Sequence, residues 1–224
     1  MRRSLRADSR ARPAGDPQHA TVQWSGARRG DAVLDVCCGS GDIAVRLSQV
    51  VGAAGSVVGL DFAAAQREVA ARREAEARGA GGASDAAAVR WLEGDACAMP
   101  FDDAAFDAAT CGYGLRNVVD IPAALSELHR VLRPGATAAL LDFNRSESAL
   151  VQAAQRTMLD NVVVPVARAA GVAAEYEYLV PSIERFPTGR EQVALARAAG
   201  FAHASHYELV GGLMGVLVAT KARA

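Results

Sequence analysis

Acidic side chains stand at the ends of successive predicted strands, and one lies inside the first strand. Asp35 belongs to that first, buried strand, Asp61 ends the second, and Asp95 closes the third after Gly94. In a parallel sheet, ligands bind at the edge where the strands end. Carboxylates there can accept hydrogen bonds from ribose hydroxyls and attract a cation. The spacing therefore predicts a site for a ligand that contains ribose and carries positive charge.

A glycine turn separates the first predicted strand from the helix that follows it. The run Gly39-Ser40-Gly41-Asp42-Ile43-Ala44 fits G-x-G-x-x-A, the fingerprint of dinucleotide-binding folds. Glycines let the backbone approach a ligand closely, and the helix start offers free N–H donors. The same physics serves S-adenosylmethionine. The turn by itself therefore leaves a nucleotide-dependent oxidoreductase open as an alternative.

Asp42 favours S-adenosylmethionine as the cofactor. A carboxylate at this position would repel the pyrophosphate of a dinucleotide, whereas S-adenosylmethionine has no phosphate and carries an ammonium and a sulfonium. Asp95 suits contact with the adenine amino group, with the Ala96 N–H close by. The alternatives are that Asp42 caps the helix and that Asp95 is an ordinary solvated strand end.

Strands and helices alternate along the chain, which indicates an α/β fold with a mostly parallel sheet. Helices are expected at 42–51, 62–78, 121–132 and 189–199, and a helical but irregular segment at 146–187. Seven strands are expected, at 32–37, 56–61, 89–93, 106–111, 136–143, 201–209 and 213–220. Only Gly211-Gly212 separates the last two strands, a hairpin signal. A C-terminal antiparallel strand on such a sheet is typical of the Rossmann-like class I methyltransferase fold.

Composition limits the alternatives. With 224 residues, 51% hydrophobic residues and a net charge of −1, the chain predicts one globular domain without a basic surface for nucleic acid. We place the S-adenosylmethionine-dependent methyltransferase domain at 21–224. Residues 1–20 are rich in Arg and poor in acids, and they read either as a disordered tail or as an organelle transit segment.

Cysteine and histidine spacing does not predict a metal site. The four cysteines include the adjacent pair Cys37 and Cys38, and none forms a C-x-x-C motif. We interpret them as small, buried, unpaired thiols. His203 and His206 lie three residues apart in a predicted strand, so their side chains should point to opposite faces.

Several stretches resemble the UbiE/MenG-type C-methyltransferases of quinone biosynthesis, and the resemblance spans roughly 22–221. The matching runs include Glu93-Gly-Asp-Ala, Met99-Pro-Phe, Gly112-Tyr-Gly-Leu-Arg-Asn-Val and Arg130-Val-Leu-Arg-Pro-Gly. The Gly-Leu-Arg-Asn element is the most family-specific of them. Within the family, Asp35-Val-Cys-Cys-Gly-Ser-Gly-Asp, Asp160-Asn-Val-Val-Val-Pro-Val-Ala and His206-Tyr-Glu-Leu-Val-Gly-Gly-Leu-Met-Gly resemble the plant and cyanobacterial branch that makes phylloquinone.

The resemblance implies methylation of 2-phytyl-1,4-naphthoquinone (demethylphylloquinone). Because a quinone ring carbon is a poor nucleophile, we expect the quinol to be the reacting form. The alternatives are another prenylated benzoquinol or naphthoquinol, or a homologue that has lost turnover. The resemblance places cofactor contacts on Ser40, Asp61, Asp95, Ala96 and Gly112, to which the turn adds Asp35, Gly39 and Gly41.

Arg116 is the predicted catalytic residue, because a guanidinium can stabilise a developing phenolate or orient a water. The alternative is a structural ion pair with Asp120 or Asp142. Tyr113 and Asn117 are weaker candidates.

One departure concerns the substrate cover. Many relatives have a Tyr-Asp-containing helix before the equivalent of Trp24, where this chain has Arg12-Pro-Ala-Gly-Asp-Pro. We therefore expect a reduced lid or a missing N-terminal segment. The apolar side chains of 150–180, from Met158 to Tyr178, could line a channel for the prenyl chain of the naphthoquinol, or simply pack in the core. A prenylated substrate implies peripheral membrane contact. In a plant or alga the expected location is the chloroplast, and otherwise the cytoplasm or a membrane surface; the sequence does not give the oligomeric state.

Overall fold

A single sheet organises the chain in the computed structural model, which describes residues 16–79, 85–158, 161 and 179–224. The strands are β1 (Ala32–Val36), β2 (Ser56–Asp61), β3 (Val89–Glu93), β4 (Phe106–Gly112), β5 (Leu132–Phe143), β6 (His203–Leu209) and β7 (Met214–Thr220). They form a seven-stranded sheet in the order β3-β2-β1-β4-β5-β7-β6. The pairs from β3 to β5 are parallel, and β7 is antiparallel to both β5 and β6. The predicted fold class is confirmed.

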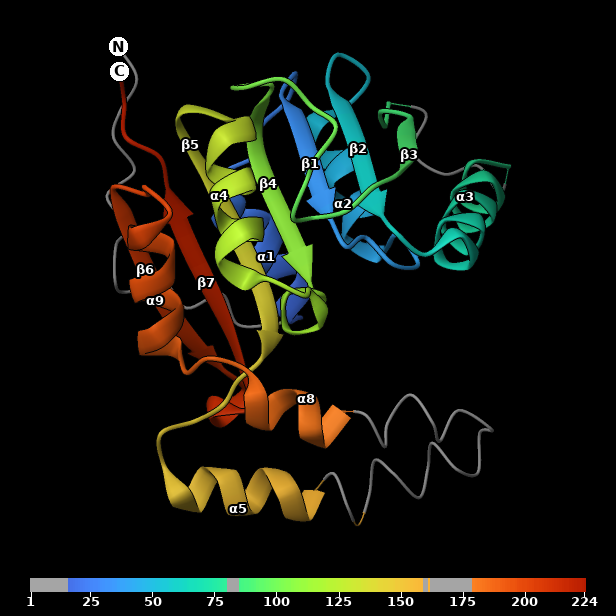
Figure 1. Cartoon of the computed structure of the whole chain (residues 1–224). Helices are drawn as coiled ribbons and strands as arrows, with labels where there is room; N and C mark the ends of the chain where they lie inside the picture. Colours follow the sequence, from blue (N-terminus) through green and yellow to red (C-terminus); the bar gives the residue numbers. More distant parts are fainter. Residues whose placement is uncertain (1–15, 80–84, 159–160, 162–178) are drawn as a thin grey trace.

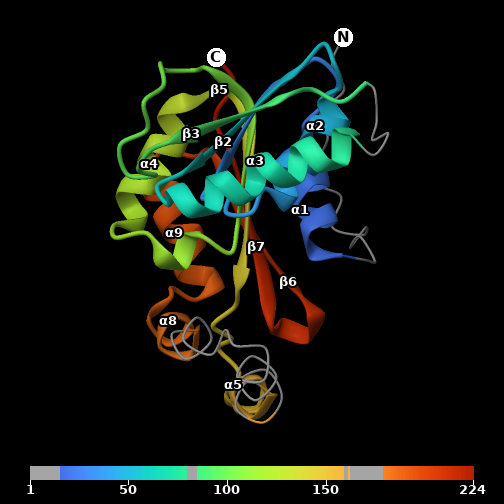
Figure 2. The same cartoon turned by 90° about the vertical axis from the view of Figure 1, so that its right-hand side faces the viewer.

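Helices cover both faces of this sheet (Figures 1 and 2). They are α1 (Pro17–Ser25), α2 (Asp42–Val51), α3 (Ala64–Gly79), α4 (Ile121–Val131), α5 (Ala149–Met158), α8 (Leu179–Arg185) and α9 (Gly189–Ala198). Two short 3-10 helices are η1 (Leu115–Asn117) and η3 (Val210–Gly212). Figure 2 shows α1 and α2 on one face and α4 and α9 on the other, with α3 beside β3 at the edge of the sheet.

The central strands are buried on both sides, as parallel strands between two helical layers must be. In β1, every residue from Val33 to Val36 is buried, and its neighbours are β2 and β4. In α2, Ile43, Leu47 and Val51 recur with helical spacing and are buried against the sheet. This packing fixes the strand ends from which the predicted site is built.

The N-terminal helix α1 was not expected. Asp16 caps it by accepting a hydrogen bond from the Gln18 N–H at 3.0 Å, Pro17 occupies its first turn, and Gly26 ends it in the left-handed conformation. Ala20 and Thr21 are buried, and Trp24 stacks on Tyr207 with ring centroids 5.0 Å apart. Helix α1 thus begins at Pro17, before the domain start predicted at residue 21, and continues past it. Residues 1–15 lie outside the described part of the chain.

The passage from α4 into β5 differs from expectation. The sequence predicts a helix that ends at residue 132 and a strand that begins at residue 136, with Arg133-Pro134-Gly135 between them. Instead β5 begins at Leu132, directly after α4 ends at Val131. The pairing with β4 shifts register between Phe106 and Ala108, so an irregularity in the ladder absorbs the proline. The predicted hairpin at Gly211-Gly212 is confirmed, with η3 between β6 and β7.

Helices α5 and α8 lie beyond the end of the sheet at which the parallel strands finish, as both views show (Figures 1 and 2). Leu179 and Ile183 of α8 pack against Phe143 at the end of β5. Most of the predicted channel residues, from Leu159 to Tyr178, and the side chain of Met158 lie outside the described residues. No helix in the described ranges is long and apolar enough to cross a membrane.

Candidate active site

A cavity of about 750 Å³ opens at the carboxyl ends of β1, β2, β3 and β4. This is the edge where the predicted acidic residues were expected to meet. Of the predicted site residues, all except Gly41 line it: Asp35, Gly39, Ser40, Asp61, Asp95, Ala96, Gly112 and Arg116. The fold therefore brings together residues that lie as far apart in the sequence as Asp35 and Arg116.

Asp35 is a buried carboxyl group at the bottom of this cavity. Its Oδ1 accepts a hydrogen bond from the Thr110 Oγ1 of the neighbouring strand at 2.7 Å, and the residue is 1% exposed. Burial raises the pKa of Asp35 to about 7, against the opposing hydrogen bonds from Thr110 and the Ala44 backbone. Among the residues that the structure describes, no hydrogen bond or ion pair joins Asp35 to a cationic side chain. A cationic ligand in the cavity would stabilise its ionised form.

Asp61 ties the glycine turn to the end of β2. Its Oδ2 accepts the Gly39 N–H at 2.8 Å and its Oδ1 accepts the Ala63 N–H at 2.9 Å. Each carboxylate oxygen can accept more than one hydrogen bond, so both retain capacity for ribose hydroxyls. Asp95 is placed similarly, since its Oδ1 accepts the Cys97 N–H at 2.8 Å.

The two glycines of the turn, Gly39 and Gly41, have different surroundings. Both have positive φ, at 52° for Gly39 and 85° for Gly41. A Cβ on Gly39 would meet nothing within 4 Å, whereas a Cβ on Gly41 would lie 2.6 Å from the Trp91 ring. Gly41 does not line the cavity. Gly41 packs the turn closely against Trp91 of β3, and a direct cofactor contact at Gly41 stays a prediction.

Asp42 is not a free carboxylate, although the sequence-based preference for S-adenosylmethionine over a dinucleotide treated it as one. Its Oδ1 accepts from Arg73 Nη2 at 2.8 Å and its Oδ2 accepts from Ser40 Oγ at 2.8 Å. Burial raises the pKa of Asp42, but the hydrogen bonds from Arg73 and Ser40 outweigh it and lower the pKa overall. Asp42 lines the cavity but is already paired with a cation, so Asp35 is the stronger determinant of ligand charge.

Arg116 forms the ion pair that was foreseen as an alternative to a catalytic role. Its Nη1 lies 2.6 Å from Asp142 Oδ1, and both side chains are largely buried. Arg116 also lines the cavity, and its buried Nε has no hydrogen-bond partner in the described part of the chain. The ion pair is therefore real, and it leaves donors of the guanidinium unused.

Two exposed apolar side chains at the cavity were missed from the sequence. Phe62 is 78% exposed and Val119 is 101% exposed, and both line the cavity. Gln18 of α1 also lines it, so the N-terminal helix does contribute to the cover that was expected to be reduced. Phe62 directly follows Asp61, and that adjacency is the signal that could have identified it.

The cysteines are free thiols, and Cys37 and Cys38 line the cavity. Cys37 has φ of 53° although it is not glycine, and a Cβ on Gly114 would lie 2.2 Å from the Cys37 Cβ. The hydrogen bond with Cys37 and burial both raise the pKa of Cys111. Cys37 and Cys38 are therefore packed components of the cavity wall. The described residues hold no group of three or more His, Cys, Asp or Glu side chains that could bind a metal ion.

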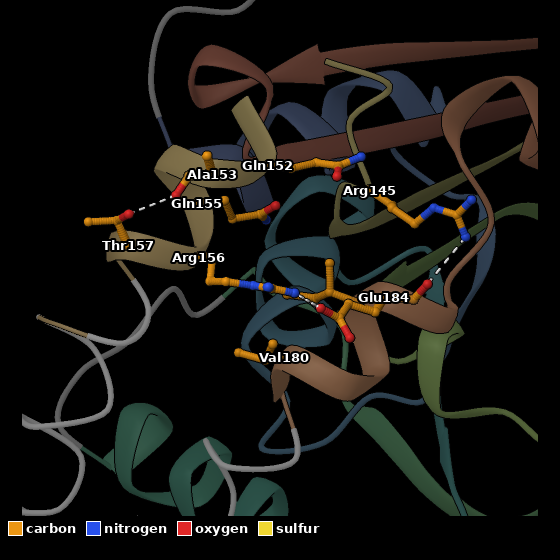
Figure 3. A pocket seen from close by; sticks show the side chains of 9 residues that line it. Arg145, Gln152, Ala153, Gln155, Arg156, Thr157, Val180 and Glu184 are labelled. Carbon is orange, nitrogen blue, oxygen red and sulfur yellow. Dashed lines mark hydrogen bonds and ion pairs between the residues drawn. The ribbon is translucent and has the colours of Figure 1, made fainter. Parts of the chain in front are cut away.

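A second cavity, of about 640 Å³, lies between α5 and α8 (Figure 3). Its lining mixes polar and apolar side chains, and an ion pair joins Arg156 of α5 to Glu184 of α8. It contains none of the predicted site residues. The cavity at the strand ends is therefore the candidate active site.

Comparison with known proteins agrees with this architecture. A solved structure described as a SAM-dependent methyltransferase from Aquifex aeolicus matches with a TM-score of 0.64, at 20% identity, and covers 91% of this chain and 89% of that one. At such identity the match concerns the fold alone. It supports the assignment of the sheet and its helical layers to the class I methyltransferase fold.

Two relatives match over most of their length. The "2-phytyl-1,4-naphtoquinone methyltransferase" of Nostoc punctiforme is 51% identical over 200 residues, which are 89% of this chain and 84% of that protein. The "2-phytyl-1,4-beta-naphthoquinone methyltransferase, chloroplastic" of Arabidopsis thaliana is 52% identical over 205 residues, 91% of this chain and 77% of that protein. The model of the ubiE/COQ5 methyltransferase family matches residues 17–221. The chain belongs to the ubiE/COQ5 methyltransferase family.

Proposed function

We propose that the chain transfers a methyl group from S-adenosylmethionine to a ring carbon of reduced 2-phytyl-1,4-naphthoquinone, in the synthesis of phylloquinone. The observation that carries the proposal is one cavity with a buried carboxyl at its base, Asp35, and a guanidinium in its wall, Arg116. The names of the two relatives support the substrate, because about half of all residues are identical over most of the chain.

The cavity fits the cofactor in charge and in shape. Asp35 is a buried carboxyl that pairs with no cationic side chain in the described part of the chain, and it would pair with the positive methionine part of the cofactor. Gly39 leaves the space where a side chain would stand, and Asp61 and Asp95 would accept hydrogen bonds from the ribose and the adenine amino group. When bound, S-adenosylmethionine supplies an electrophilic methyl group on a sulfonium.

Phe62 and Val119 extend this assignment. An aromatic side chain that is 78% exposed next to Asp61 is suited to stack on the adenine ring. Val119 lies between η1 and α4, on the same strand-end segment as Arg116. We assign it to contact with the apolar part of the acceptor. A fully exposed valine at a cavity mouth is unfavourable in water, and a prenylated ligand would bury it.

The acceptor must be the quinol. A quinone ring carbon is electron-poor, whereas the quinol, on losing a hydroxyl proton, donates electron density to the adjacent carbon. Arg116 would stabilise the resulting phenolate oxygen, because a guanidinium supplies several donors and a fixed positive charge. The remaining task of the cavity is to align the ring carbon with the methyl group and to exclude water.

The test compares the two redox forms of the acceptor. Purified full-length protein is incubated with S-adenosylmethionine and 2-phytyl-1,4-naphthoquinone, with dithionite and without it, under nitrogen. We expect methylated product only with the reductant. Equal rates in both would overturn the quinol assignment, and a preference for a prenylated benzoquinol would move the substrate to another member of the class. Cofactor binding without any product would indicate a homologue that has lost turnover.

We also propose that the protein contacts a membrane peripherally and, in a plant or alga, acts in the chloroplast. A phytylated acceptor dissolves in the bilayer, and the Arabidopsis relative is named as chloroplastic. Co-sedimentation of the protein with vesicles that contain the acceptor would support the membrane contact, and no binding above protein-free controls would contradict it. Full retention of a fluorescent fusion outside chloroplasts would contradict the location.

A further inference from the structure

Asp142 contacts Arg116 twice but does not line the cavity. It lies at the end of β5, with a side chain that is 5% exposed. Its Oδ1 accepts from Arg116 Nη1 at 2.6 Å, and its Oδ2 accepts from the Arg116 backbone N–H at 3.1 Å. The Phe143 N–H donates to Oδ1 at 2.8 Å. One carboxylate therefore fixes both the main chain and the side chain of Arg116.

Further contacts restrict the guanidinium to one arrangement. Nη1 also donates to the Tyr113 carbonyl at 2.5 Å, and Tyr113 has a left-handed φ of 59°, which is uncommon for a bulky residue. The Phe143 ring lies under the guanidinium, 5.3 Å from its central carbon. Tyr113 and Phe143 are in ring contact at 5.5 Å. The Arg116 side chain is thus ordered before any ligand arrives, which lowers the entropy cost of using it.

Because Asp142 and Tyr113 occupy Nη1 of Arg116, only the other N–H groups of its guanidinium remain available to a ligand. A guanidinium has five N–H groups, and the acceptors of Nη1 are Asp142 and the Tyr113 carbonyl. Nε is buried and has no partner among the residues that the structure describes. Nη2 also has no acceptor among these residues, and unlike Nε it is not buried, so its N–H groups are the ones that a ligand can reach. The unused donors belong to a side chain in the wall of the candidate active site.

We propose that Asp142 is a positioning residue for methyl transfer. It holds Arg116 through Nη1, and the N–H groups of Nη2, for which the described residues supply no acceptor, bind the acceptor oxygen that loses its proton. Asp142 itself touches neither acceptor nor cofactor. The inference rests on the proposed function, because it assigns a supporting residue to the same reaction.

A double-mutant cycle tests whether Asp142 acts through Arg116. Methyl transfer to the reduced acceptor is measured for Arg116→Ala, Asp142→Asn and the double variant, and S-adenosylmethionine binding is measured by calorimetry. We expect kcat to fall about 10²–10³-fold for Arg116→Ala and about 10–100-fold for Asp142→Asn. The double variant should equal Arg116→Ala, since Asp142 then has nothing to position. Cofactor affinity should not change.

Chemical rescue distinguishes positioning from a general effect on the fold. Free guanidinium, added below its denaturing range, should restore activity to Arg116→Ala, because Asp142 provides the counter-charge that binds it. The double variant should not be rescued. Asp103→Asn is the matched control, because Asp103 pairs with Arg130 on the surface and its side chain is 80% exposed. It should leave kcat unchanged.

Asp142→Glu keeps the test decisive if Asp142→Asn unfolds. The longer carboxylate retains the charge but displaces the guanidinium, so kcat should fall while the melting temperature holds. The proposal is overturned if either Asp142 variant turns over at the wild-type rate, if the double variant falls well below Arg116→Ala, or if rescue persists without Asp142. If the wild-type chain transfers no methyl group to the reduced acceptor, the proposed function fails instead.

Discussion

Asp35 and Thr110 form a hydrogen bond of 2.7 Å between the neighbouring strands β1 and β4, at the base of the candidate active site. The Asp35 carboxyl is 1% exposed, and burial raises its pKa to about 7. The protonation state of the cavity floor therefore changes close to neutral pH. This places a titratable group directly beside the position we assign to a cationic cofactor.

Cofactor affinity should rise with pH through this transition. Only the ionised carboxylate attracts a cation, so at one pH unit below a pKa of about 7 about nine-tenths of the protein is in the weakly binding form. We expect the dissociation constant of S-adenosylmethionine to be about tenfold higher at pH 6 than at pH 8. Asp35→Asn should bind weakly at both pH values. Calorimetry at the two pH values measures this, and a pH-independent wild type would contradict it.

The free energy of unfolding of the cofactor-free protein should fall as pH rises, whereas cofactor affinity increases. A pKa raised from 3.8 to about 7 means that the folded chain holds the Asp35 proton more tightly than the unfolded chain does. The contribution of this group to the free energy of unfolding is therefore largest at low pH and is lost as pH rises from 3.8 to about 7. Urea denaturation should show Asp35→Asn gaining stability relative to wild type between pH 5 and pH 8. A constant difference between the two proteins would refute this.

Substitutions of the two turn glycines should have different effects: Gly41→Ala should lower stability, and Gly39→Ala should also weaken cofactor binding. In Gly41→Ala the new Cβ meets Trp91 at 2.6 Å, and in both variants the residue keeps a positive φ. We expect Gly41→Ala to lower the free energy of unfolding by about 1–3 kcal/mol, since the packed ring cannot give way freely, while cofactor affinity changes little. Gly39→Ala should cost about 1 kcal/mol from its backbone conformation and should weaken cofactor binding, because its Cβ enters the cavity. Chemical denaturation and calorimetry on both variants measure the two effects, and a loss of binding only in Gly41→Ala would reverse the assignment.

Phe62 should affect binding of the cofactor only, and Val119 should affect binding of the acceptor only. Both side chains are exposed, so replacing either by Ala should leave the melting temperature unchanged. Phe62→Ala should weaken cofactor binding by about 0.5–1.5 kcal/mol through loss of stacking. Val119→Ala should raise KM for the phytylated acceptor without changing cofactor affinity. An equal effect of the two variants on S-adenosylmethionine binding would contradict this division.

The sequence predicted most of the sheet because its signals are local. Val33, Leu34 and Val36 form an apolar run bounded by turn residues, and Gly39 and Gly41 mark the strand-to-helix turn. The element α1 had equally local signals in Asp16, Pro17 and Gly26, but the expectation of a disordered tail concealed them. The start of β5 was misplaced because Pro134 and Gly135 are typical of a turn that follows a helix, and only pairing with β4 shows that the strand already begins at Leu132.

The sequence could predict which residues line the cavity, but not which residues they form hydrogen bonds with. Strand-end acids can be identified from spacing, and seven of the eight predicted cofactor residues do line the cavity. The partners of these residues could not be identified, because Arg73 for Asp42 and Thr110 for Asp35 come from distant parts of the chain. Arg116 was expected to be either catalytic or paired with an acid. The structure pairs it with Asp142 through Nη1, and its catalytic role stays a prediction.

The most direct test of the central claim is product analysis with an isotopically labelled methyl donor. Full-length protein, S-adenosylmethionine with a deuterated methyl group and reduced 2-phytyl-1,4-naphthoquinone are incubated under nitrogen, and the extracted quinone is analysed by mass spectrometry and NMR. We predict one deuterated methyl group on the ring carbon next to the phytyl-bearing carbon, formed by the wild type and reduced at least about 100-fold in Arg116→Ala. Label on oxygen, on another molecule, or on no quinone at all would contradict the account.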